Sequence, residues 1–236
     1  MRNSYEGTPF DLTQGLAAGA FASPSRWSTP QTVSDELVCW ERSIATYKSI
    51  VSLVAQSRSW LPDEVGGVLW FSNHCAKTSF YSPFAVGQQS IPSVSFSENS
   101  LDNLGRNVSA YWAAKVLFNV AELKQFYMIE DIRNLQDDTE GVDGSEGLQK
   151  FVDDKFVSDP EFDMADVEKM YNRNAINNVV KFWKFSDQML MNYADGYCDG
   201  CGGDRNRHLG YPQWWLDDDE VYGDNGGTGD DDGGVV

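Results

Sequence analysis

The sequence is poor in the residues that most often bind metal ions, and it is poor in basic residues. It has 2 histidines and 4 cysteines among 236 residues, which excludes a histidine-rich metal site. Its 18 Lys and Arg stand against 36 Asp and Glu, so a net charge of -18 argues against binding to the phosphates of a nucleic acid. No apolar run approaches the ~20 residues of a membrane span. Residues 1–6 contain no signal peptide, so the compartment stays unknown.

The composition is that of a folded protein with regional acidity. Hydrophobic residues make up 41% and aromatic residues 13% of the chain, which is typical of a globular domain. Acidic residues are concentrated in residues 130–168 and again in residues 216–236. We expect residues 1–194 to form the folded body. We expect residues 195–236 to form a Gly- and Asp-rich acidic tail, partly disordered, with an aromatic cluster at residues 211–215.

The first half of the chain has the pattern of strands. Residues 1–45 look irregular, with aromatic anchors that let them lie on a larger body. Residues 50–55 have strand composition, and residues 68–71 form a second strand after a loop rich in turn residues. Together they predict a β-hairpin. The segment 79–86 predicts a third strand.

The second half has the pattern of helices. Apolar residues three or four apart predict one helix from about residue 107 to residue 136. The acidic, Gly-bearing residues 137–147 read as a loop, and a second long helix is expected from Asp159-Pro160 to about residue 194. Strands followed by helices predict an α+β fold rather than alternating βαβ units.

Few residues carry an obvious chemistry. Cys198, Cys201 and His208 have tolerable spacing for three zinc ligands but lack a fourth, so zinc, a disulfide and free thiols all stay open. The acidic tail lacks the ligand spacing of a calcium loop. His74 and Cys75 are neighbours in the chain, which is not the geometry of a nucleophile and its base.

Three stretches together resemble the secernin-related cysteine dipeptidases. They are residues 5–19 (beginning Tyr-Glu-Gly-Thr-Pro-Phe-Asp-Leu-Thr), residues 56–71 (Gln-Ser-Arg-Ser-Trp-Leu-Pro-Asp-Glu-Val-Gly-Gly-Val-Leu-Trp-Phe) and residues 112–132. Residues 208–216 resemble the terminal motif of eukaryotic members. The resemblance is strong over residues 5–136 and weak from there to residue 194.

The resemblance implies an N-terminal-nucleophile hydrolase with a four-layer αββα sandwich, and it implies no cofactor. In that family the mature chain begins with a cysteine that attacks the amide carbonyl of a short peptide. Its own α-amine, with an ordinary pKa of ~7.7–8.0, is the base. Here Met1 is followed by Arg2, and the first cysteine is Cys39, after the Tyr-Glu-Gly-Thr block. We therefore expect the C-terminal portion of such an enzyme, inactive alone, or a non-catalytic secernin-like binding or regulatory protein.

The resemblance also singles out site residues. Arg58 matches a family arginine at a strand end, where it would orient the nucleophile or bind a substrate carboxylate; the alternative is a salt bridge to Asp63 or Glu64. Asn73 would supply an oxyanion-hole amide, or is a turn residue. The block containing Tyr5, Glu6 and Asp11 would line the substrate cleft, or pin a coil. Missing strands would leave sheet edges exposed and favour self-association.

Overall fold

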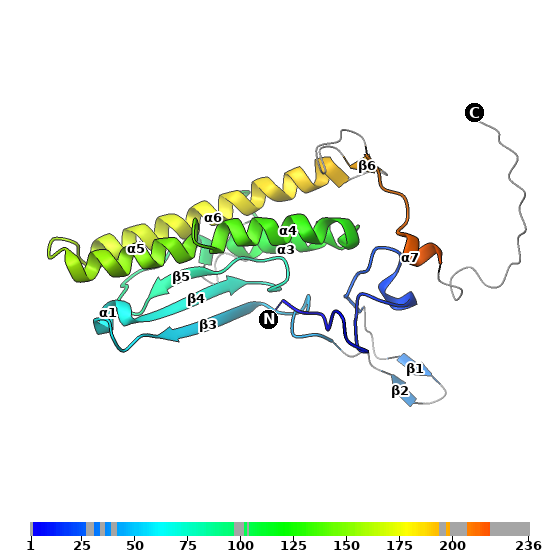
Figure 1. Ribbon diagram of the computed structural model, residues 1–236, viewed down its shortest axis with the longest axis horizontal. Coiled ribbons are helices and arrows are strands. Elements are labelled where there is room, and N and C mark those ends of the chain that lie inside the picture. The colour runs from blue at the N-terminus through cyan, green and yellow to red at the C-terminus, as the bar shows by residue number, and fades with distance from the viewer. Residues whose placement is uncertain are drawn as a thin grey trace, which may run out of the picture.

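The computed structural model describes most of the folded body (Figure 1). The described residues are 2–26, 31–33, 36–38, 42–96, 102, 104–193, 197–198 and 207–217. Most of the acidic tail, Cys39 and Cys201 therefore lie outside the described residues. Within the described part, no helix is both long and apolar enough to cross a membrane.

The centre of the molecule is a three-stranded antiparallel sheet. Its strands are β3 (Val51–Ser57), β4 (Gly67–Asn73) and β5 (Ser82–Ala85), in that order. The register pairs Val51 with Asn73 at one end of the hairpin and Ser57 with Gly67 at the other. The hairpin and the third strand were both predicted and are confirmed. The connection between β3 and β4 contains a short helix, α1 (Asp63–Gly66).

Burial changes sharply across this sheet. All four residues of β5 are buried, whereas six of the seven residues of β3 are exposed. In Figure 1, β5 lies nearest the helices and β3 farthest from them. Leu53 and Val54, which point to opposite faces of β3, are 48% and 45% exposed. No other strand of the described residues pairs with the outer edge of β3. The strand thus presents apolar side chains and an open backbone edge to solvent.

Four long helices follow the sheet in the described part of the chain. They are α3 (Ala110–Ala121), α4 (Gln125–Glu140), α5 (Ser145–Ser158) and α6 (Met164–Tyr193). The prediction of one helix over residues 107–136 is wrong, because the chain turns at residues 122–124. The loop predicted at residues 137–147 is also wrong in extent: α4 continues to Glu140, and only residues 141–144 separate it from α5.

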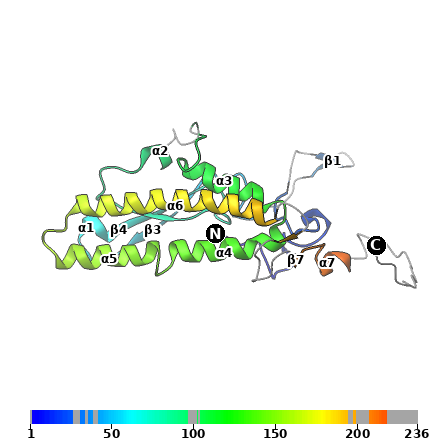
Figure 2. The same cartoon turned by 90° about the horizontal axis from the view of Figure 1, so that it is seen from above.

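Helix α3 starts where local chemistry favours it. The side chain of Ser109 caps α3 by accepting a hydrogen bond from the backbone N–H of Trp112 at 3.2 Å. The predicted start of the last helix at Asp159-Pro160 is too early, because α6 begins at Met164. At 30 residues, α6 is about 45 Å long at 1.5 Å per residue. Figure 2 shows α6 running beside α4 and α5 along the length of the body.

The main core lies between α3, α4, α6 and the buried side of β5. Its fully or nearly fully buried members include Phe80, Leu117, Met128, Ile132 and Phe182. A second, smaller core under α5 and α6 is formed around Val65, Val152, Val167 and Tyr171. The mixed architecture confirms the predicted α+β class.

The remaining elements are short. They are a 3-10 turn at Leu16–Ala18, the hairpins of β1 (Gln31–Val33) with β2 (Glu36–Val38) and β6 (Tyr197–Cys198) with β7 (Arg207–His208), α2 (Ser93–Phe96) and α7 (Gln213–Leu216). The N-terminal residues lie against the segment after β4, since the Arg2 guanidinium donates to the carbonyls of Ala76 and Ser79.

Candidate functional site

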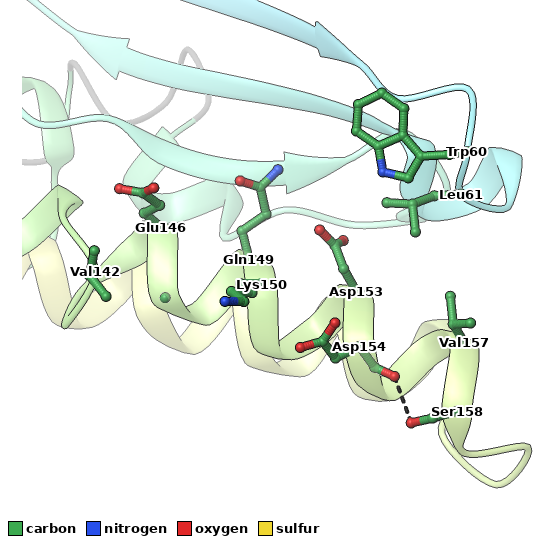
Figure 3. Close-up of a pocket in the computed structure, with 11 residues that line it drawn as sticks. Trp60, Leu61, Val142, Glu146, Gln149, Lys150, Asp153, Asp154, Val157 and Ser158 are labelled. Carbon is green, nitrogen blue, oxygen red and sulfur yellow. Dashed lines mark hydrogen bonds between the residues drawn. The ribbon is translucent and has the colours of Figure 1, made fainter.

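A cleft lies between the loop after β3 and helix α5 (Figure 3). Its volume is about 750 Å³, and Trp60 and Leu61 form the side that faces the helix. The helix side carries three carboxylates and one cation, from Glu146, Lys150, Asp153 and Asp154. Figure 3 shows Gln149 and Asp153 pointing from α5 toward the sheet. The cleft is therefore acidic on one side and aromatic on the other.

Arg58 is 6% exposed and contacts Asp153, one of the residues that line this cleft. One guanidinium nitrogen, Nη1, forms an ion pair with the Asp153 carboxylate. Nη2 donates to the carbonyl of Val65 at 2.5 Å, and Nε donates to the carbonyl of Gly66 at 3.4 Å. A salt bridge to Asp63 or Glu64 was the alternative predicted for Arg58. The structure contains a salt bridge of Arg58, but its partner is Asp153 on α5. Arg58 thus ties the end of β3 and α1 to α5.

Asp153 is held in an unfavourable environment despite this ion pair. Burial raises the pKa of its carboxyl, and the charge of Arg58 opposes that rise. Its Oδ1 atom is buried without a hydrogen-bond partner, as is the hydroxyl of Tyr171 beneath it. Burial and the nearby Asp153 charge also raise the pKa of Tyr171. This end of the sheet is a buried polar cluster in which Arg58 supplies the positive charge.

The opposite end of β4 carries Asn73, His74 and Cys75. Asn73 is 8% exposed and its Oδ1 accepts no hydrogen bond. His74 is fully buried with a φ of 65°, and burial together with the Lys115 charge lowers its pKa to about 4. Burial raises the pKa of the free Cys75 thiol to about 11. His74 and Cys75 are therefore neutral at pH 7, and neither has the character of a catalytic dyad.

The Tyr5–Asp11 block forms a tight loop near this same end. Asp11 accepts hydrogen bonds from the backbone N–H of Gly7 at 3.1 Å and of Thr13 at 2.8 Å. Although burial alone would raise the pKa of Asp11, the hydrogen bonds from Thr13 and Gly7 lower it. Tyr5 and Gly7 have φ values of 65° and 77°. Asp11 thus closes the loop. This contact fits the second of the two predicted roles, in which the residue holds an irregular segment in place and does not line the substrate cleft.

Glu6 is the member of the block that faces a cavity. It lines a pocket of about 360 Å³ together with Arg2, Asn3, Lys77, Arg133 and Gln136. Its Oε1 lies 2.9 Å from the Nζ of Lys77 and 3.7 Å from Nη2 of Arg133. Although burial opposes it, hydrogen bonds from Lys77 and Ser4 lower the pKa of Glu6. Glu6 is therefore an ionised carboxylate surrounded by cations.

The structure does not bring all the predicted residues together. Arg58 follows the end of β3 that pairs with Gly67, whereas Asn73 pairs with Val51 at the other end. At 3.3 Å per residue the two are separated by roughly 20 Å. Glu6 instead lies beside Lys77, four residues after Asn73. The predicted residues thus divide between two places on the sheet.

Sequence reasoning missed Lys77, Arg133 and Asp153. Lys77 had a usable signal, because it is the one Asp, Glu, Lys or Arg between Glu64 and Glu98. A single charge in an otherwise uncharged stretch is either buried with a partner or functional. Asp153 had no comparable signal, since it is one of many acids in residues 130–168.

The cysteine pair near the C-terminus is only partly described. Cys198 is disulfide-bonded, so it is not a thiolate ligand. Cys201 and the side chain of His208 lie outside the described residues. Within the part of the chain that the structure describes, no three His, Cys, Asp or Glu side chains converge as metal ligands do.

Comparison with protein families identifies the class. A family model of peptidases, the hydrolases that cleave peptide bonds, matches residues 1–138, which include the whole sheet, α3 and most of α4. The chain belongs to Peptidase family C69, the family that contains the secernin-related cysteine dipeptidases. No match was found among curated proteins. Every residue that lines the Glu6 pocket lies within the matched part, whereas Asp153 lies beyond it.

Proposed function

We propose that the chain is part of a cysteine-type dipeptidase that hydrolyses the amide bond of short peptides, with its nucleophile outside the described residues. The observation that carries this proposal is the match to Peptidase family C69 over residues 1–138. The mechanism is that of an N-terminal cysteine, whose thiolate attacks the carbonyl while its own α-amine accepts the proton. An acyl-enzyme forms, and water then releases the product.

The described cysteines do not suit this task. A nucleophilic cysteine needs a lowered pKa and access to substrate. Cys75 is fully buried with a raised pKa, and Cys198 is disulfide-bonded. The proposal therefore assigns the nucleophile to a cysteine elsewhere, at the start of a processed polypeptide. It makes the 236-residue chain inactive when isolated.

The sheet supports this assignment. A four-layer αββα sandwich needs further strands and a second sheet, and the exposed edge and faces of β3 are where they would pack. Unpaired edges of this kind also favour self-association of the isolated chain. The packing of further strands and the self-association of the isolated chain both depend on the exposed strand β3.

Three of the predicted site residues keep a proposed role. We assign the buried amide of Asn73 to the oxyanion hole, where its N–H₂ would stabilise the developing negative charge. We assign Glu6 and the neighbouring Tyr5 to the wall of the substrate site. Arg58 and Asp11 hold the surrounding structure, since their polar atoms are engaged by Asp153 and by Gly7 and Thr13.

A non-catalytic, secernin-like binding protein is the second candidate. It is favoured by one observation: neither cysteine whose side chain the structure describes is an activated thiol. This candidate needs no nucleophile. The two candidates therefore make different predictions for a longer polypeptide: a dipeptidase hydrolyses dipeptides, and a binding protein does not.

The deciding experiment uses the genomic sequence upstream of the Met1 codon. A longer reading frame that begins its mature form with cysteine is expressed and assayed for release of amino acids from a set of dipeptides. We expect hydrolysis that disappears when the first cysteine is changed to alanine and survives Cys75→Ala. Absence of hydrolysis by a correctly processed chain favours the non-catalytic candidate. Hydrolysis by the isolated 236-residue chain that is lost in Cys39→Ala refutes the location of the nucleophile.

A further inference from the structure

The pocket around Glu6 concentrates positive charge in a strongly acidic protein. Arg2 and Lys77 come from the N-terminal segment and the loop after β4, and Arg133 comes from α4. The chain as a whole has a net charge of -18. Arg2 pairs with Glu140 at 2.5 Å and Lys77 pairs with Glu6 at 2.9 Å. Arg133 is the third cation of the pocket, and its contact with Glu6 is longer, at 3.7 Å.

Arg133 is held differently from the other two cations. Lys77 is 3% exposed, and it donates to Glu6 at 2.9 Å and to the hydroxyl of Ser4 at 2.7 Å. The side chain of Arg133 is 57% exposed, and its distance of 3.7 Å to Glu6 is too long for a hydrogen bond. Among the described residues, Glu6 is its sole acidic partner. The planar fork of its guanidinium is therefore open toward the pocket.

Glu6 cannot approach Arg133 more closely without leaving its own partners. Its other oxygen accepts a hydrogen bond from the backbone N–H of Ser4 at 2.5 Å. The loop that carries Glu6 is held by hydrogen bonds from the backbone N–H of Gly7 to Asp11 at 3.1 Å and from the hydroxyl of Thr8 to the carbonyl of Tyr5 at 2.7 Å. A carboxylate from outside can take the fork of Arg133 in the two-bond geometry that Glu6 does not reach.

We propose that this pocket binds the terminal carboxylate of a short peptide through the guanidinium of Arg133, with Lys77 and Arg2 as its positive surroundings. The choice of a peptide as ligand rests on the proposed function, whereas the carboxylate chemistry rests on the pocket alone. The role that the sequence assigns to Arg58 thereby passes to Arg133. Arg58 has its guanidinium engaged by Asp153 and two carbonyls, and Arg133 has not.

The test is a binding titration of the 236-residue chain, followed by NMR of the isotope-labelled protein. Alanylalanine is the probe, and its C-terminal amide is the same molecule without the carboxylate. We expect saturable binding of alanylalanine that shifts the backbone signals of residues 4–7 and 76–78. The amide and the variant Arg133→Gln should each weaken binding about tenfold or more, the range of a lost charge-assisted hydrogen bond. Arg133→Lys, which keeps the charge but not the fork, should fall between.

Arg106→Gln is the matched control. Arg106 has the same 57% side-chain exposure and pairs with Asp187, away from the pocket. The proposal is overturned if the amide binds as well as the acid, if Arg133→Gln behaves like Arg106→Gln, or if inorganic phosphate binds more tightly than the dipeptide. Because the titration needs no hydrolysis, it fails or succeeds separately from the dipeptidase assay. If a longer polypeptide carrying Arg133→Gln cleaves dipeptides as well as the unchanged polypeptide does, only the proposed carboxylate pocket is refuted.

Discussion

Changing Arg58 to methionine separates a structural arginine from one that binds substrate. In the folded protein this guanidinium pairs with Asp153 and caps the carbonyls of Val65 and Gly66. Methionine fills a similar volume but leaves the Asp153 carboxylate and the Val65 carbonyl without the guanidinium donor, whereas the Gly66 carbonyl keeps its 2.8 Å hydrogen bond from the backbone N–H of residue 58. The Asp153 side chain is 15% exposed, so water replaces little of what is lost.

The expected size of the effect follows from this burial. Removing one partner of a buried ion pair costs about 3–5 kcal/mol, because the other charge stays buried and unpaired. The residual exposure of Asp153 puts the loss near the lower limit, at about 3 kcal/mol. The double change Arg58→Met with Asp153→Leu removes both charges and should restore most of the stability. The two changes should therefore be strongly non-additive.

Urea unfolding, followed by tryptophan fluorescence, measures all three variants against the parent. The pH dependence of the free energy of unfolding provides a second check. Burial already raises the pKa of Asp153, and removing Arg58 raises it further. A raised pKa in the folded state favours the protonated form, so the deficit of Arg58→Met should shrink as the pH falls and grow toward neutral pH. A loss below about 1 kcal/mol, or an additive double variant, would refute the structural role.

Three further predictions concern other buried or exposed groups. His74, with its pKa lowered to about 4, should make stability fall as the pH drops from 6.5 toward 4; His74→Leu should flatten this urea-midpoint profile, and an unchanged profile would contradict the prediction. Cys75 should resist iodoacetamide in the folded protein at pH 8 and react in urea, and rapid native labelling would contradict its raised pKa. Leu53→Lys should reduce self-association in sedimentation experiments, whereas Ile176→Lys, similarly exposed on α6, should leave it unchanged.

The elements that the sequence predicted correctly are those with a strong local pattern. β3 and β4 have strand composition on both sides of a Pro- and Gly-containing loop, and their register follows from that loop. The break between α3 and α4 escaped prediction, because apolar spacing continues through residues 116–127 while the backbone turns. The sequence predicted no helix at α5: its first three residues fall in the predicted loop 137–147, and the rest carries few buried residues among its acids. Tertiary burial of Val152, rather than local preference, makes that segment a helix.

The site was harder to predict because its partners are distant in the chain. Arg58 and Asp153 are 95 residues apart, so the nearby Asp63 and Glu64 looked like the natural partners. Glu6 and Lys77 are 71 residues apart. Spacing along a sequence reports on helices and strands, whereas a salt bridge between a strand end and a distant helix depends on the packing of the whole domain.

The two arginines also differ in what substrate binding would require of them. For Arg58 to grip a carboxylate, its pair with Asp153 must break and Asp153 must stay buried without a partner, a penalty of about 3 kcal/mol that corresponds to more than a hundredfold in affinity. Arg133 has no such penalty, because its contact with Glu6 is long and solvent reaches its guanidinium. Arg133 also lies within the residues that match Peptidase family C69, as does the rest of its pocket. A peptidase that must bind and release small peptides in each turnover is better served by the arginine that no internal carboxylate holds tightly.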